Sequence, residues 1–209
     1  MKAKHFAFVL IVAAAVSGCA SHYILVPPAV DLTQMGNIGI VTLKAAEAKG
    51  DLDAVASQDF LEEVTAAQRV PVVELGPSDT VLADLGKTAF DRETILALGQ
   101  KHNIDAFFAG EIGLTKVKPK LDLAAPLSRT LLAHTAMNMT VKVRLVSTKN
   151  GATLWTNSAT RQITTGSVGI EYGIPVFAVR DKDAALNQLL RQVMYQMTWD
   201  FRPTQQRVK

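Results

Sequence analysis

The chain has 209 residues, of which 48% are hydrophobic and 20% are charged. This composition is too apolar for a disordered protein, and the length excludes more than one or two domains. The single cysteine excludes a disulfide within the chain. The formal net charge is +3, but Lys2 and Lys4 belong to the N-terminal segment, so the remainder is nearly neutral and binding to nucleic acid is not expected.

The N-terminal segment, residues 1–18, has the organisation of a secretory signal peptide. Lys2 and Lys4 form its basic start, and the apolar stretch from Phe6 to Val16 is too short to span a bilayer. The next residues, Val16-Ser17-Gly18-Cys19, resemble the lipobox of bacterial lipoproteins. This resemblance implies cleavage before Cys19, attachment of diacylglycerol to its thiol, and acylation of the new N-terminus, for example with palmitate.

The lipobox also implies a location for the protein. The residue after Cys19 is Ala20, not the aspartate that in enteric-type bacteria favours retention in the inner membrane. The resemblance therefore implies a lipid anchor in the outer membrane, with the protein on its periplasmic face. Several acyl chains give durable anchoring where one does not. The alternative is an ordinary cleaved signal peptide followed by a chance cysteine.

The rest of the chain has the pattern of one domain with short extensions. Residues 19–36 contain Pro27-Pro28 and no sustained periodicity, which is typical of a tether or of an extended segment along a sheet edge. A single domain is expected over residues 37–201, and a polar tail over residues 202–209. The sequence contains no internal repeat and no linker to a second domain.

Strand and helix signals alternate in the first half of this domain. Apolar and β-branched runs predict strands at residues 37–43, 70–75 and 105–112, and helical spacing predicts helices at residues 51–68 and 91–102. Asp51 and Asp91 are suited to cap the starts of these helices, and Asn103 suits the C-terminal turn of the second.

The second half predicts a hairpin and a final helix. Residues 137–148 alternate between apolar and polar side chains, Asn150-Gly151 provides a turn, and residues 152–164 return as the partner strand. An amphipathic helix is expected over residues 181–201. Residues 113–136 are expected to form a long loop. Residues 166–180 are apolar and interrupted by glycines, and are expected to form either a docking loop or a buried sheet edge.

The order of these elements, β-α-β-α-β-β-β-α, predicts an α/β (α+β) fold. The early alternation favours crossover connections and parallel strands, while the later hairpin adds antiparallel strands. We expect a single mixed sheet of about five strands with helices packed on it, the last of them the C-terminal amphipathic helix.

Motifs that would indicate catalysis are incomplete. The segment Gly86-Lys87-Thr88 lacks the first glycine of a phosphate-binding loop, and Gly166-Ser167-Val168-Gly169 lacks the first glycine of a nucleophile elbow, so a loop and a turn are expected there. The histidines have no metal-ligand spacing, and Glu62 and Glu63 point in different directions. Glu111 is either a functional carboxylate or a residue exposed at a strand end. We therefore expect no enzymatic activity, no metal and no cofactor.

Several segments, in this order, resemble one group of envelope proteins. They are the lipobox at Cys19 and the strand segments Ile38–Val41, Val70–Glu74, Ile104–Glu111 and Val141–Trp155, the last of which contains the hairpin turn. The group comprises the curli-secretion-channel lipoproteins, the lipoprotein activators of penicillin-binding proteins, and the N-terminal domain of TolB. The resemblance covers roughly residues 37–200 and implies the fold of this group.

Two departures limit what this resemblance implies. The Thr-Gly of the family hairpin is here Asn150-Gly151. A curli-type channel also builds its pore from extra membrane-spanning hairpins with alternating residues, and neither residues 113–136 nor residues 166–180 alternate well enough to supply them. A pore made by the chain itself is therefore not expected.

We expect a periplasmic interaction module that docks on a protein of an envelope machine, for secretion or export or for cell-wall synthesis. The candidate partner-binding residues are Lys116, Lys118 and Lys120 in the long loop, and Ile174, Val176 and Phe177 in the apolar segment. One alternative is a structural lipoprotein that self-assembles into a ring or channel component of the outer membrane. A hydrolase or transferase without a recognisable motif and a carrier of a small ligand are the remaining alternatives.

Overall fold

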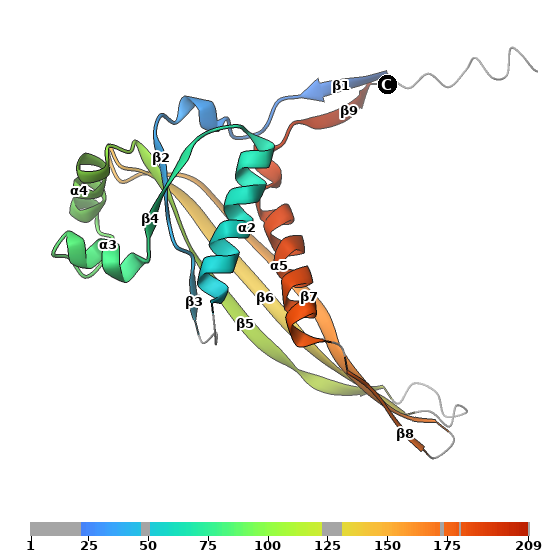
Figure 1. Ribbon diagram of the computed structural model, residues 1–209. Coiled ribbons are helices and arrows are strands. Elements are labelled where there is room, and N and C mark those ends of the chain that lie inside the picture. Colours follow the sequence, from blue (N-terminus) through green and yellow to red (C-terminus); the bar gives the residue numbers. More distant parts are fainter. Residues whose placement is uncertain (1–21, 47–50, 123–130, 172–173, 180, 209) are drawn as a thin grey trace, which may run out of the picture.

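A long twisted sheet forms the frame of the protein in the computed structural model, which describes residues 22–46, 51–122, 131–171, 174–179 and 181–208 (Figure 1). Helices α2 (Leu52–Ala67) and α5 (Lys182–Met197) pack side by side on one face of the sheet. Two shorter helices, α3 (Ser78–Asp84) and α4 (Arg92–His102), cover one end of the other face. The expected α/β (α+β) class, with helices packed on a mixed sheet, is confirmed.

The first half of the sheet is parallel, as the alternation of strands and helices predicts. Strand β2 (Ile38–Val41) lies between β4 (Val72–Gly76) and β5 (Ala106–Asp122) and runs parallel to both. The short strand β3 (Lys44–Ala46) also pairs with β5 in parallel. All four residues of β2 are buried, which explains why this segment is apolar without alternation.

The second half of the sheet is antiparallel. Strands β6 (Leu131–Ser147), β7 (Thr153–Glu171) and β8 (Ile174–Val179) follow β5 in sequence and in space, so that the sheet has seven strands in the order β4-β2-β5-β6-β7-β8, with β3 beside β5. The hairpin predicted at Asn150-Gly151 connects β6 and β7, and Gly151 has the positive φ of 77° that a glycine accommodates.

The two segments without a clear pattern are largely strands, which corrects the expected loop at residues 113–136 and the expected turn at residues 166–169. Strand β5 continues to Asp122, and β6 begins at Leu131. A register shift between Val117 and Lys120 accommodates Pro119, and another between Thr135 and Ala136 interrupts the alternation of β6. Because a bulge resets the period of two, the sequence pattern is lost although the strands continue.

The predicted helix ends are confirmed for α4 but not for α2. The Asp91 carboxylate accepts a hydrogen bond from the Thr94 backbone N–H at 2.8 Å, and Asn103 ends α4 in the left-handed conformation with φ of 51°. Asp51 makes no side-chain capping bond to α2. The Asp53 carboxylate instead accepts a bond from the Ala45 backbone N–H at 3.2 Å, which ties the first turn of α2 to β3.

Both chain ends contain more structure than the tether and the polar tail that the sequence predicts. Strand β1 (His22–Val26) pairs with β9 (Thr204–Val208) in an antiparallel two-stranded ribbon, which projects from the domain in Figure 1. Residues 27–36 then return to the domain, and Leu32, in the short 3-10 helix η1 (Leu32–Gln34), is fully buried. The predicted final helix stops at Met197 and is followed by the 3-10 helix η2 (Trp199–Phe201).

Gln68, at the end of α2, holds both of these chain ends against the domain. Its side-chain carbonyl accepts a hydrogen bond from Leu32 N at 2.8 Å, and its amide nitrogen donates to the carbonyl oxygens of Val30 at 2.6 Å and Phe201 at 3.0 Å. One side chain therefore satisfies three backbone groups from two segments of the chain.

The main core lies between the sheet and helices α2 and α5, with Phe108 at its centre. The Phe108 ring lies 5.1 Å from the Phe60 ring, 5.9 Å from Phe201 and 6.3 Å from Trp155, measured between centroids, and each contact is edge-on. Phe107, the adjacent residue, points to the other face, where it forms a smaller core beneath α3 and α4. No helix in the described part of the chain is long and apolar enough to cross a membrane.

Replacing Phe108 with alanine should destabilise the protein by about 3–5 kcal/mol, because it removes a fully buried ring and leaves a cavity among three aromatic partners. Urea unfolding followed by circular dichroism measures the effect. Leu154→Ala, at an exposed position of β7, is the control and should cost less than about 1 kcal/mol. Similar losses in the two variants would contradict the central position of Phe108.

Candidate functional site

Strands β5 to β8 extend beyond the helices and form a four-stranded arm, defined here as residues 114–122, 131–139, 163–171 and 174–179 (Figure 1). Among the described strands, none pairs with β5 beyond Gly113 on the side away from β6. On the other side of the arm, β8 pairs only with β7. The arm thus has two open edges, whose backbone N–H and C=O groups are available for further strand pairing.

The six candidate partner-binding residues lie on these two edges. Lys116, Lys118 and Lys120 are in β5, and Ile174, Val176 and Phe177 are in β8. The structure therefore brings both groups into one arm but separates them by β6 and β7, so they form two edges and not one patch. The side chain of Lys116 is exposed.

The pairing register places one residue from each of the four strands side by side in a row across the arm, and successive rows differ in polarity. One row across the four strands contains Leu121, Ala133, Val168 and Phe177, all of which are apolar. The adjacent row contains Lys120, His134, Ser167 and Ala178, so it is largely polar.

The face of the sheet opposite α2 and α5 is polar where α3 and α4 end. Lys142 Nζ lies 3.1 Å from the Glu111 carboxylate across β5 and β6, with both side chains well exposed. The hydroxyls of Thr140 and Thr160 are 2.9 Å apart across β6 and β7. Glu111, one of the carboxylates considered in the sequence, thus forms an exposed cross-strand ion pair, which is an arrangement typical of a solvated sheet face.

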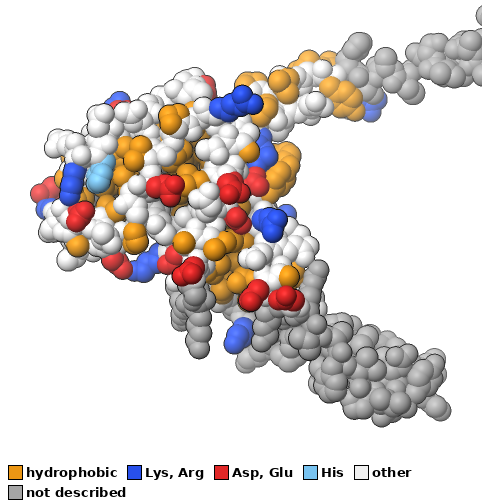
Figure 2. All heavy atoms as spheres, viewed as in Figure 1, with side chains coloured by type: hydrophobic (Ala, Val, Ile, Leu, Met, Phe, Trp, Pro, Cys, Tyr) orange, Lys and Arg blue, Asp and Glu red, His pale blue; other side chains and the backbone are white. Residues whose placement is uncertain are grey.

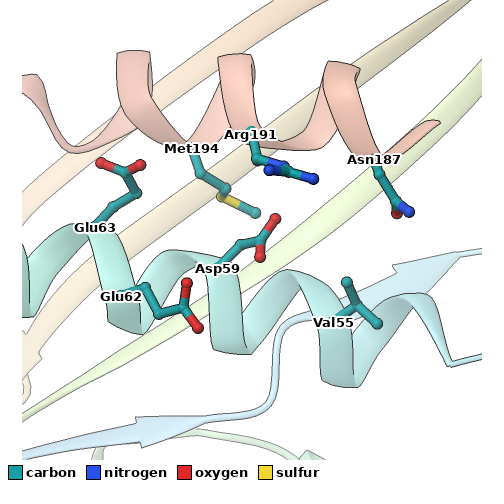
Figure 3. A pocket seen from close by; sticks show the side chains of 7 residues that line it. All are labelled: Val55, Asp59, Glu62, Glu63, Asn187, Arg191 and Met194. Carbon is teal, nitrogen blue, oxygen red and sulfur yellow. The ribbon is translucent and has the colours of Figure 1, made fainter. Parts of the chain in front are cut away.

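A groove of about 260 Å³ lies between α2 and α5 and contains several charged groups (Figure 3). Its lining residues are Val55, Asp59, Glu62, Glu63, Asn187, Arg191 and Met194. Figure 3 shows Asp59 pointing toward α5, where Arg191 and Met194 lie. In Figure 2 the acidic and basic side chains of this region lie next to one another on the surface.

The charges in this groove are only partly balanced. Burial, followed by the negative charge of Glu62, raises the pKa of Asp59 above its usual value, and the positive charge of Arg191 opposes this rise. Glu63 forms an ion pair with Arg202, and the Arg202 guanidinium also lies over the Tyr195 ring at 4.4 Å from its centroid. Glu62 and Glu63 both line the groove but have different partners, since the Gln58 side chain donates a hydrogen bond to Glu62 whereas Glu63 is ion-paired with Arg202.

The other motifs occur in ordinary structural settings. Lys87 follows α3 and forms an ion pair with Glu93 at 2.9 Å, so it does not face an open phosphate-binding loop. Ser167 lies within strand β7, which excludes a strand-to-helix nucleophile elbow at this position. Within the described residues, no three His, Cys, Asp or Glu side chains are grouped so that they could hold a metal ion.

Sequence reasoning did not identify the electrostatic interaction of Asp59 with Arg191 or the aromatic pair Tyr195 and Trp199. Asp59 and Arg191 are on helices at opposite ends of the chain, so no local spacing relates them. Tyr195 and Trp199 are four residues apart at the end of α5, with ring centroids 5.8 Å apart, and both are about half exposed. Their helical spacing was a usable signal, but it is also the spacing of core residues.

No family model matches the sequence, and no curated protein sequence matches it either. Among solved structures, the chain is similar to the PelC dodecamer from Paraburkholderia phytofirmans, with 11% identity, a TM-score of 0.44, and coverage of 87% of this chain and 97% of that chain. It is also similar to lipoprotein GNA1162 from Neisseria meningitidis, with 18% identity, a TM-score of 0.37, and coverage of 62% and 84%.

The LpoB C-terminal domain from Escherichia coli is a further similar structure, with 9% identity, a TM-score of 0.36, and coverage of 61% of this chain and 82% of that chain. These similarities concern the arrangement of strands and helices.

Neutralising Asp59 should stabilise the protein at pH 7. Since the pKa of Asp59 is raised in the folded state, its charged form is less favourable there than in the unfolded chain, and this cost appears as the pH rises above the unfolded value near 3.8. Asp59→Asn should therefore raise the unfolding free energy at pH 7 by less than about 1 kcal/mol and change it little at pH 3.

Urea unfolding of both proteins at the two pH values measures this difference. Glu74→Gln, at an exposed position of β4, serves as a matched control that removes one negative charge elsewhere. A loss of stability in Asp59→Asn at pH 7 would mean that the attraction to Arg191 exceeds the cost of burying the carboxylate.

Proposed function

We propose that the protein is a non-enzymatic lipoprotein of the outer membrane, attached through acylated Cys19 and facing the periplasm. It serves as an accessory module that docks on a protein of an envelope machine, for secretion or for cell-wall synthesis. The observation that carries this proposal is the four-stranded arm with its two open edges. A long exposed strand edge is a ready site for an added strand from a partner.

The position of the arm supports a docking role. The arm and the β1–β9 ribbon lie at opposite ends of α5, whose 16 residues span roughly 24 Å (Figure 1). A protein attached to a membrane by residues just before β1 would therefore hold its arm away from the point of attachment. Strand β7, with 19 residues, extends along the molecule for roughly 60 Å.

The two edges differ in charge and thus in the partner segment that each would accept. The β5 edge carries Lys116, Lys118 and Lys120, which suit an extended segment with acidic side chains. The β8 edge, Ile174–Val179, contains no charged residue and suits an apolar segment. Lysines on this edge also disfavour pairing of two β5 edges with each other, because like charges would then face one another.

The docking role can be tested with a photo-crosslinking amino acid placed in cells at Lys118, at Val176 or at the control position Val73, which is exposed on β4. One envelope protein should crosslink to the arm positions and not to Val73. The double variant Ile174→Ser and Phe177→Ser should lose the crosslink at Val176 while still unfolding cooperatively. An unchanged crosslink in this variant would exclude the β8 edge as the docking site.

Self-assembly into a ring or channel component is the second candidate function. It is favoured by the fact that the two open edges belong to different strands, so the β5 edge of one copy can pair with the β8 edge of the next. A contact of this head-to-tail kind closes into a ring if the rotation between copies allows it.

Thiol crosslinking distinguishes this candidate. Lys120 and Ala178 lie in the same row across the arm, so Lys120→Cys and Ala178→Cys in one chain place a thiol on each edge. A bis-maleimide that spans about 10 Å tolerates a register shift of about two residues. A ring predicts a ladder of multimers for the double variant and at most dimers for each single variant; monomers throughout would exclude this assembly.

A further inference from the structure

We infer that the β1–β9 ribbon, together with Tyr195 and Trp199 at the end of α5, is a second membrane contact that lies against the lipid headgroups beside Cys19. This inference rests on the lipid anchor of the proposed function and adds a protein surface to it. The partner of this protein surface is the face of the bilayer, and neither strand of the ribbon needs to cross the membrane.

The first observation is the distribution of exposed apolar side chains. Nine large hydrophobic residues are exposed in the described part of the chain, and six of them are in the ribbon or at the end of α5. These six are Tyr23 (59% exposed), Ile24 (52%), Leu25 (69%), Val208 (47%), Tyr195 (47%) and Trp199 (49%). Figure 2 shows hydrophobic side chains along much of the ribbon surface. A concentration of this kind at one end indicates a surface that is covered in the cell.

The second observation is that the ribbon lacks other support. Its two strands pair only with each other, and no other described strand extends this small sheet. An isolated two-stranded ribbon is marginally stable in water. Tyr23 and Leu25 lie on the same face of the ribbon, and their burial against an apolar or interfacial environment supplies the stabilisation that the rest of the domain does not.

The length of chain before the ribbon identifies the membrane as this environment. His22, the first residue of β1, is three residues after Cys19, and three residues reach at most about 10 Å. The polar headgroup layer of a bilayer is itself about 5–10 Å deep. When Cys19 carries its acyl chains, β1 therefore begins at or just above the headgroups.

The side chains at this end match the chemistry of a headgroup layer. Tyrosine and tryptophan favour membrane–water interfaces because their rings are apolar and their N–H or O–H groups are polar. Arg207 pairs in register with Tyr23 on the ribbon, and Arg202 lies over the Tyr195 ring. The exposed Arg207 guanidinium can bind lipid phosphates, and neither ribbon strand contains an acidic residue that the phosphates would repel.

Site-directed spin labelling tests this contact in the lipidated full chain, reconstituted into vesicles of phosphatidylethanolamine and phosphatidylglycerol. Leu25→Cys or Gln205→Cys, which pair with each other on one face of the ribbon, introduces a thiol for a nitroxide label, and Val73→Cys provides an exposed control on β4. For the ribbon labels, collisions with lipid-soluble oxygen relative to a water-soluble nickel chelate should be about tenfold more frequent than for Val73, as expected for burial among headgroups.

A ribbon label with the same collision ratio as the Val73 label would overturn the inference. Spin–spin broadening at Leu25 that disappears on dilution with unlabelled protein would also overturn it, because a second copy would then cover the ribbon. Circular dichroism of each labelled protein verifies that the fold is retained. Two separate ribbon positions ensure that failure of one variant to fold does not decide the result.

The anchor itself is checked independently in the same samples. Cys19 is the only cysteine, so an acylated chain with one new cysteine takes up one label, whereas a chain with a free Cys19 takes up two. Intact mass spectrometry shows the attached acyl chains directly. Two labels and no acyl mass would refute the lipid anchor of the proposed function, whereas one label with a water-exposed ribbon would refute only the membrane contact.

Discussion

The structure depends on β5, the one strand that joins the parallel and antiparallel halves of the sheet. It pairs with β2 and β3 on one side and with β6 on the other, and two successive residues on it point to opposite faces. Phe108 anchors the core beneath α2 and α5, and Phe107 anchors the core beneath α3 and α4. The same strand then continues into the arm, so the element that organises both cores also positions the proposed docking edges.

The parts of the fold that could be predicted from the sequence are those that are determined by residues close together in the chain. The buried run at Ile38–Val41, the cap at Asp91 and the turn at Asn150-Gly151 each depend on residues that are neighbours in the chain. The arm was missed because bulges and Pro119 disrupt the alternation that signals a strand. The two sets of candidate docking residues lie in β5 and β8, and their placement on opposite edges depends on a register that only the paired strands reveal.

The remaining features were missed because they depend on contacts between distant parts of the chain. His22–Val26 and Thr204–Val208 are at the two ends of the sequence, and neither segment has a strand pattern strong enough to predict a partner. The groove formed by Asp59 and Arg191 depends in the same way on how α2 and α5 pack. The β1–β9 ribbon and the four-stranded arm thus lie at opposite ends of α5.

The hydrogen bonds of Gln68 have a mechanical consequence. In the lipid-anchored protein that we propose, tension between the membrane and a partner would enter the chain through β1. This strand leads directly into residues 27–36, so the pull acts along β1 and not across its pairing with β9. The load would then reach Leu32 and Val30, which Gln68 holds to α2. The side chain of Gln68 thus passes the load to a helix of the main core, away from the edges of the sheet.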